Sequence, residues 1–199
     1  MRILIGIPTY DRRIDIELTR TLINMERIES HSYDYMFPVS SHLARNRNMV
    51  CLQALAENYD YVLFLDSDIG ILDDHFIDKL LETSYRLDAK VVGGAYRMKK
   101  GEELIYIAAY FQGDKIDNIR YVPKEPLLVD AVGTGIMLIH NSVLRKLSDP
   151  WFTIIDKPQL DVMPEDFEFC RKAKEAGFKI ALDPRFETHH WGFRSWNHP

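Results

Sequence analysis

Two aspartates one residue apart, Asp66 and Asp68, end the apolar run YDYVLFLDSDIG at residues 59–70. If the extended conformation continues through Ser67, both carboxylates point the same way, with roughly 6.5 to 7 Å between their Cα atoms. Two like charges so close repel each other unless a cation lies between or beside them. Magnesium typically takes one or two carboxylates plus substrate phosphates. A metal that links the protein to a diphosphate would therefore explain the pair.

The same pair also has a simpler interpretation. Asp66 can hydrogen-bond the backbone in a turn while Asp68 caps a short helix, because aspartate does both often. On its own, the Asp-x-Asp pattern leaves metal binding and turn formation equally open.

Length and composition indicate one domain. A chain of 199 residues with 46% hydrophobic content is long enough for one sizeable core and short for two domains. Its 30 acidic and 25 basic residues do not suggest nucleic-acid binding. Cys51 and Cys170 stand among apolar neighbours, so we expect free thiols and a reducing, cytoplasmic location. No apolar run approaches the roughly 20 residues of a transmembrane helix.

The elements around the aspartates alternate between strand and helix. The continuous Val-Leu-Phe-Leu run before Asp66 is typical of a strand buried on both faces of a parallel sheet. Asp73 or Asp74 is expected to cap the next helix. The alternation predicts a doubly wound α/β fold. We expect strands at 3–8, 33–40, in the run itself and at 89–96, with helices at 14–28, after Ser40 or Ser41, and at 75–87.

In the second half of the chain, strand and helix patterns no longer alternate. Apolar runs at 104–111, 126–132 and 135–140 follow one another without a long helix, which predicts antiparallel or mixed additions to the sheet. The segment PEDFEFCRKAKEAGF, from Pro164, predicts a helix, and KIALDP predicts the last strand. In that helix Asp166 shares the inward face of Phe169, whereas we expect Glu165 only to favour the helix dipole.

Several segments together resemble the family 2 glycosyltransferases of the type A (GT-A) fold. They are GIPTYDR after the first strand, Ala44-Arg45-Asn46 before the aspartate strand, VDAVGTGIMLIHNSVLRKL, and PEDFEFCRKAKEAGFKIALDPRFETHHWG. The likeness spans essentially the whole chain in the expected order. It implies a single GT-A domain over 1–199, with a nucleotide-sugar-binding half at 1–100 and an acceptor-side half at 101–199. The chain could also be one domain of a longer protein.

The resemblance assigns roles to particular residues on the donor side. Asp66, Asp68 and His190, which precedes Trp191-Gly192, would hold a metal. Manganese is preferred over magnesium because it accepts a mixed imidazole and carboxylate shell. The residues that would surround the base and ribose of the donor are Pro8, Thr9, Tyr10, Asp11, Arg45, Asp66 and Ser67.

On the acceptor side, Asp166 would be the general base. Gly133, Thr134, Gly135 and Glu165 would line this side of the site. Without the resemblance, the two glycines could equally form a simple turn or bulge. Arg45 could equally be a solvated surface residue, and His190 would more often be a packing residue.

We therefore expect a metal-dependent glycosyltransferase that moves a sugar from a nucleoside diphosphate donor to an acceptor hydroxyl, with inversion. The acceptor would be a glycan, a glycoprotein or a small molecule. Because family members commonly use uridine diphosphate sugars, we expect a UDP-sugar as the donor. In many members an acidic residue at the end of the second strand contacts the nucleotide, but Phe37-Pro38-Val39-Ser40 contains none. A guanosine diphosphate sugar is therefore an open alternative.

Three alternatives remain. A retaining GT-A transferase is only weakly disfavoured. A sugar-phosphate nucleotidyltransferase needs a glycine-rich basic loop after the first strand, and PTYDRRID contains no glycine. A non-catalytic nucleotide-sugar or glycan-binding module would not need to keep Asp66, Asp68, Asp166 and His190 together.

Overall fold

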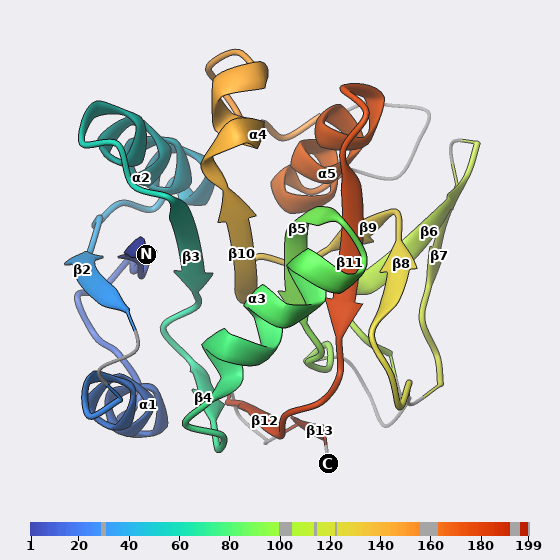
Figure 1. Ribbon diagram of the computed structural model, residues 1–199. Coiled ribbons are helices and arrows are strands. Elements are labelled where there is room, and N and C mark those ends of the chain that lie inside the picture. The colour runs from blue at the N-terminus through green and yellow to red at the C-terminus, as the bar shows by residue number, and fades with distance from the viewer. Residues whose placement is uncertain are drawn as a thin grey trace.

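A seven-stranded sheet forms the centre of the molecule (Figure 1). The computed structural model describes residues 1–28, 31–99, 105–113, 115–121, 123–155, 163–191 and 196–198. The order of the strands is β2 (Ser32–Met36), β1 (Arg2–Gly6), β3 (Tyr61–Leu65), β10 (Ile136–His140), β5 (Ala89–Gly94), β11 (Lys179–Asp183) and β8 (Leu127–Val129).

Five strands of this sheet run in the same direction, and two strands run the other way. β1 is parallel to β2 and β3, and β5 is parallel to β11. β10 lies antiparallel between β3 and β5, and β8 is antiparallel to β11. The predicted α/β fold with antiparallel additions is confirmed. The apolar run of β3 correctly indicated burial, but one of its two neighbours is antiparallel.

Helices cover both faces of the sheet because successive strand residues alternate between two cores. Leu4 and Phe64 face one core, which contains α2 (Leu43–Ala56), α4 (Asn141–Lys146) and α5 (Glu165–Glu175). Ile5 and Leu65 face the other, with α1 (Ile16–Glu26) and α3 (Phe76–Arg86). Each fully buried side chain of this size contributes roughly 1.5 to 3 kcal/mol through the hydrophobic effect.

Two smaller sheets adjoin the main one. The first has the order β13 (Trp196–His198), β12 (Thr188–His190) and β4 (Ile69–Ile71). The second has the order β7 (Lys115–Asn118), β6 (Ala108–Gln112) and β9 (Ala131–Val132). β4 follows β3 and β12 follows β11, so the first small sheet lies beyond the carboxyl ends of these two strands (Figure 1).

Several predicted boundaries differ from the structure. The run at 59–70 is two strands, β3 and β4, separated by a turn, and the predicted strand 33–40 ends at Met36. The N-cap residues are His42 for α2 and His75 for α3, in place of the serines and aspartates. Ser40 and Asp73 still contribute, because their side chains accept the N–H groups of these two histidines. Two predicted positions, Leu104 and Gly192, lie outside the described residues.

Among the described residues, no helix combines the length and the apolar character needed to cross a membrane.

Candidate active site

The segment Asp66–Asp68 is a turn between β3 and β4. The Ile69 N–H donates to the Asp66 carbonyl at 3.2 Å, which closes the turn. The Asp66 N–H donates to the Gly135 carbonyl at 3.0 Å, so the turn is fixed to the segment before β10. The chain is therefore not extended through Ser67, as the estimate of the distance between the two aspartates had assumed. The two carboxylates have different partners as a result.

Asp68 faces His190 across the small sheet. The register pairs His190 with Ile69, and the Trp191 N–H donates to the Asp68 carbonyl at 2.9 Å. His190 Nε2 lies 3.6 Å from Asp68 Oδ1. The pairing of β4 with β12 therefore brings together two predicted metal ligands that are distant in the sequence.

The hydrogen bonds of His190 define which ring nitrogen carries the proton. Nδ1 lies 2.7 Å from the carbonyl oxygen of Arg97, which can only accept, so Nδ1 is the donor. When Nε2 carries no proton, this nitrogen faces Asp68 and is available to a metal ion, as metal-binding histidines usually require. His189 points elsewhere, with Nε2 3.2 Å from Glu187.

Lys99 is a third member of this cluster, and the sequence argument did not select it. Its ammonium contacts Asp68 Oδ2. Burial alone would raise the pKa of Asp68, but the hydrogen bonds and charges of His190 and Lys99 outweigh burial and hold this pKa below its usual value. Asp68 is therefore ionised at neutral pH and already has a cationic partner.

The described residues offer two protein ligands to a metal. Within the described ranges, no group of three His, Cys, Asp or Glu side chains is placed to hold a metal ion. Asp66 Oδ1 lies 3.3 Å from Arg47 Nη2, so Asp66 has a different partner from Asp68. A carboxylate and an imidazole with a free Nε2 fit a divalent cation whose other ligands are phosphate oxygens and water.

A buried arginine, Arg47, holds the second group of carboxylates. It is 2% exposed and pairs with Glu165 through Nη1 and with Asp66 through Nη2. Arg45, the predicted donor-binding arginine, is exposed. Helical spacing could have identified Arg47, because it lies three, four and seven residues before the buried Val50, Cys51 and Ala54.

Glu165 and Asp166 begin α5, and both lie at this site. Glu165 does more than favour the helix dipole, since it is buried and paired with Arg47. Asp166 is partly buried, and its Oδ1 accepts the Phe167 N–H at 2.8 Å. Burial raises the pKa of Asp166 to about 6; Arg47 opposes the rise and Glu165 adds to it. This carboxylate is ionised at neutral pH and is a stronger base than an ordinary aspartate.

Tyr96 lies between the Asp68–His190 cluster and the Gly135 segment that holds Asp66. The sequence did not indicate it as a site residue. Its hydroxyl accepts the Gly135 N–H at 2.8 Å, and its ring packs edge-on to His190 with 5.3 Å between centroids. A Cβ on Gly133 would lie 2.2 Å from the Tyr96 oxygen, and one on Gly135 would lie 2.6 Å from Tyr96 Cζ. The Tyr96 ring can pack here only because both positions lack a side chain. Thr134, between the two glycines, is buried.

The loop after β1 adjoins the aspartate turn. The Asp15 N–H donates to the Ser67 carbonyl at 2.7 Å. Pro8 and Thr9 are buried, whereas Asp11 is exposed and the Tyr10 side chain is 78% exposed. The exposed aromatic ring of Tyr10 on this loop is available to stack on a planar base.

The start of α2 is fixed to this loop as well. Asn46 is buried, and its side-chain amide donates to the Ser40 carbonyl at 3.1 Å. The same amide lies 3.5 Å from the Thr9 carbonyl. The Ala-Arg-Asn motif thus contributes a residue that joins α2 to the predicted donor loop.

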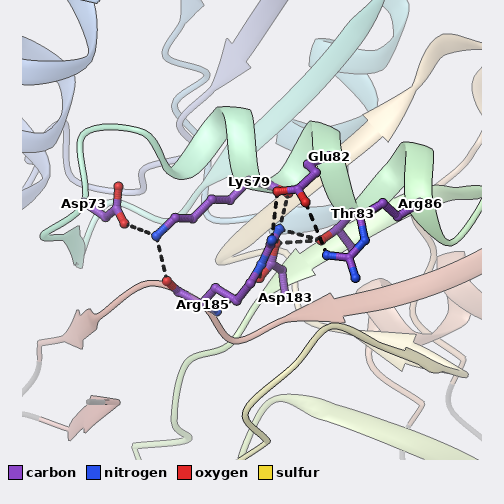
Figure 2. Close-up of polar contacts among 7 residues, drawn as sticks. All are labelled: Asp73, Lys79, Glu82, Thr83, Arg86, Asp183 and Arg185. Carbon is purple, nitrogen blue, oxygen red and sulfur yellow. Dashed lines mark hydrogen bonds and ion pairs between the residues drawn. The ribbon is translucent and has the colours of Figure 1, made fainter.

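A network of ion pairs holds the chain between β11 and β12 (Figure 2). Asp183 is fully buried and accepts hydrogen bonds from Thr83 Oγ1 at 2.8 Å and Arg185 Nε at 3.0 Å. Arg185 also bonds Glu82 at 2.8 Å and the Lys79 carbonyl at 2.9 Å, both on α3. The connection that leads to His190 is therefore anchored to α3.

Comparison with known proteins shows a shared fold. No family model and no curated protein matches the sequence. The structure is similar to A197 from STIV, with a TM-score of 0.63 and 22% identity over 96% of this chain and 86% of that chain. It is also similar to S. aureus TarS 1-349, with a TM-score of 0.48 and 12% identity over 99% of this chain and 60% of that chain. At 22% identity the likeness to A197 concerns the fold and not the activity.

Proposed function

We propose that the protein transfers a sugar from a nucleoside diphosphate sugar to an acceptor hydroxyl. The observation that carries this proposal is the cluster at the carboxyl end of β3, where Asp68 and His190 face each other 3.6 Å apart. Ligands of open α/β sheets gather outside the carboxyl ends of the strands. The resemblance of the motifs to family 2 glycosyltransferases supports the same function.

Asp68 and His190 would hold a divalent cation, for which manganese is our first choice. When bound, such a cation supplies positive charge to the departing diphosphate. The loop at 8–11, together with Ser67 and Arg45, binds the base and ribose of the donor. A uridine diphosphate sugar is our first choice of donor.

Asp166 removes the proton from the acceptor hydroxyl. Its raised pKa of about 6 makes it a better base while leaving it ionised at pH 7. Arg47 holds Glu165 and Asp66 beside it and compensates their charge. Gly133, Thr134 and Gly135 line the acceptor side. A base of this kind acts in a single displacement, which inverts the anomeric centre.

The test is release of free nucleoside diphosphate from a panel of donors, with manganese and with a chelator. NMR of the product gives its anomeric configuration. Asp166→Asn should lower transfer by roughly 10² to 10⁴ while donor binding barely changes. Asp117→Asn, the same change on exposed β7, is the matched control.

Two outcomes would revise the proposal. Normal transfer by Asp166→Asn with inactive Glu165→Gln would move the base to Glu165. Donor binding without any release of diphosphate would indicate a binding module and overturn catalysis.

A further inference from the structure

Lys99 lies where a cation would approach Asp68. Its ammonium contacts Asp68 Oδ2, while His190 Nε2 lies 3.6 Å from Oδ1 of the same carboxylate. The Lys99 side chain is 28% exposed and that of Asp68 is 42% exposed, so solvent and ligands can reach both. An exposed pair of this kind adds little to stability, so its contribution to folding is small.

The backbone beside Lys99 is fixed at the site. The Met98 N–H donates to the Ile105 carbonyl at 2.8 Å, and the Arg97 carbonyl accepts from His190 at 2.7 Å. The same short segment thus orients the imidazole and presents the ammonium. The backbone one and two residues before Lys99 is therefore fixed at the site, and the flexible four-carbon stem of Lys99 lets its ammonium change partners.

We propose that Lys99 is a diphosphate-binding residue that exchanges partners. In the free protein its ammonium neutralises Asp68. When a divalent cation binds at Asp68 and His190, Lys99 leaves the carboxylate and pairs with the phosphate oxygens. This inference rests on the proposed function, because it requires a cation and a diphosphate at this carboxylate.

The physical reason is competition between positive charges. An ammonium and a divalent cation on one carboxylate repel each other, so binding of the cation expels Lys99. A cation at this position also binds phosphate oxygens, which brings two new negative partners within reach of the displaced ammonium. Lysine is well suited to this exchange, because its flexible stem carries a compact charge that binds phosphate without a fixed geometry.

The exchange predicts opposite effects of one substitution on two ligands. In Lys99→Gln, Mn²⁺ alone should bind several-fold more tightly than in the wild type, because no ammonium competes for Asp68. Pyrophosphate in the presence of saturating Mn²⁺ should bind roughly 10- to 100-fold more weakly, because a charge-assisted hydrogen bond is lost. A lysine that only neutralised Asp68 would raise the affinity for Mn²⁺ but would not weaken the binding of pyrophosphate, so the second effect is the decisive one.

The experiment is titration calorimetry of the full chain with Mn²⁺ and then with pyrophosphate. Lys90→Gln is the matched control, because Lys90 lies near the start of β5 and pairs with Asp88 at 3.4 Å. This control should leave both affinities unchanged. Equal pyrophosphate affinity in Lys99→Gln and wild type overturns the proposal, as does weaker Mn²⁺ binding in Lys99→Gln or no Mn²⁺ binding to the wild type.

These readouts involve no sugar. If they show both expected shifts while no donor is turned over, the proposed transfer fails and the assignment of Lys99 stands.

Discussion

Replacing Asp166 by asparagine should stabilise the protein at neutral pH. Burial disfavours the charged form of this carboxylate and raises its pKa to about 6. Asparagine has nearly the same size, cannot ionise, and keeps an oxygen that can accept the Phe167 N–H. The substitution therefore removes a buried charge with little change in packing.

The magnitude follows from the shift of the pKa. Folding raises the pKa of Asp166 from its ordinary value of 3.8 to about 6, a change of about two units. One unit corresponds to about 1.4 kcal/mol, so the upper bound is about 3 kcal/mol. Because Asp166 is only partly buried, we expect about 1 to 3 kcal/mol.

Proton binding to Asp166 determines how the free energy of unfolding changes with pH. Between about pH 4 and 6 the folded protein holds a proton on Asp166 that the unfolded chain has released. The contribution of this group to stability is complete below pH 4 and is lost as the pH rises through 6. The advantage of Asp166→Asn over the wild type should therefore grow from pH 4 to pH 7 and then remain constant.

The assay is urea unfolding of both proteins at pH 4, 5, 6, 7 and 8, with chelator present. The difference in the free energy of unfolding between the two proteins is the quantity to compare. Asp117→Asn, on an exposed strand, should show no such dependence on pH. A difference that stays constant from pH 4 to pH 8 would refute the raised pKa.

Three further substitutions test the packing of the site. Arg47→Met leaves the buried Glu165 and the half-buried Asp66 without their partner and should cost about 3 to 5 kcal/mol in chemical unfolding. Thr83→Val removes a 2.8 Å hydrogen bond to buried Asp183 and should lower the free energy of unfolding by about 1 to 3 kcal/mol. Gly135→Ala places a methyl 2.6 Å from Tyr96 Cζ and should lower the melting temperature, by an amount that corresponds to about 1 to 3 kcal/mol; an unchanged melting temperature would contradict this packing.

Much of the fold could be predicted because hydrophobic pattern and local signals agree. The burial of β3 followed from its uninterrupted apolar residues, and α5 followed from its helical spacing between Pro164 and Gly177. The missing helix before β10 indicated an antiparallel or mixed addition, but its place between β3 and β5 could not be predicted. An apolar strand looks the same in sequence whichever way its neighbour runs.

The sequence predicted several residues of the candidate site but few of the contacts between them. The sequence selected Asp68, His190 and Asp166, and the structure brings the first two together. It selected Arg45 where the buried arginine is Arg47, because the motif was followed and not the inward face of the helix. It gave Glu165 a lesser role than its ion pair with Arg47 indicates.

The sequence by itself determined the alternation of strands and helices and the placement of acidic residues at the end of a buried strand. These depend on neighbours along the chain, and periodicity records them. Tertiary structure alone decided that Lys99 joins Asp68 and His190 and that Tyr96 connects this cluster to Gly135. Such contacts depend on strand pairing and turn geometry between distant segments, which no local pattern of residues specifies.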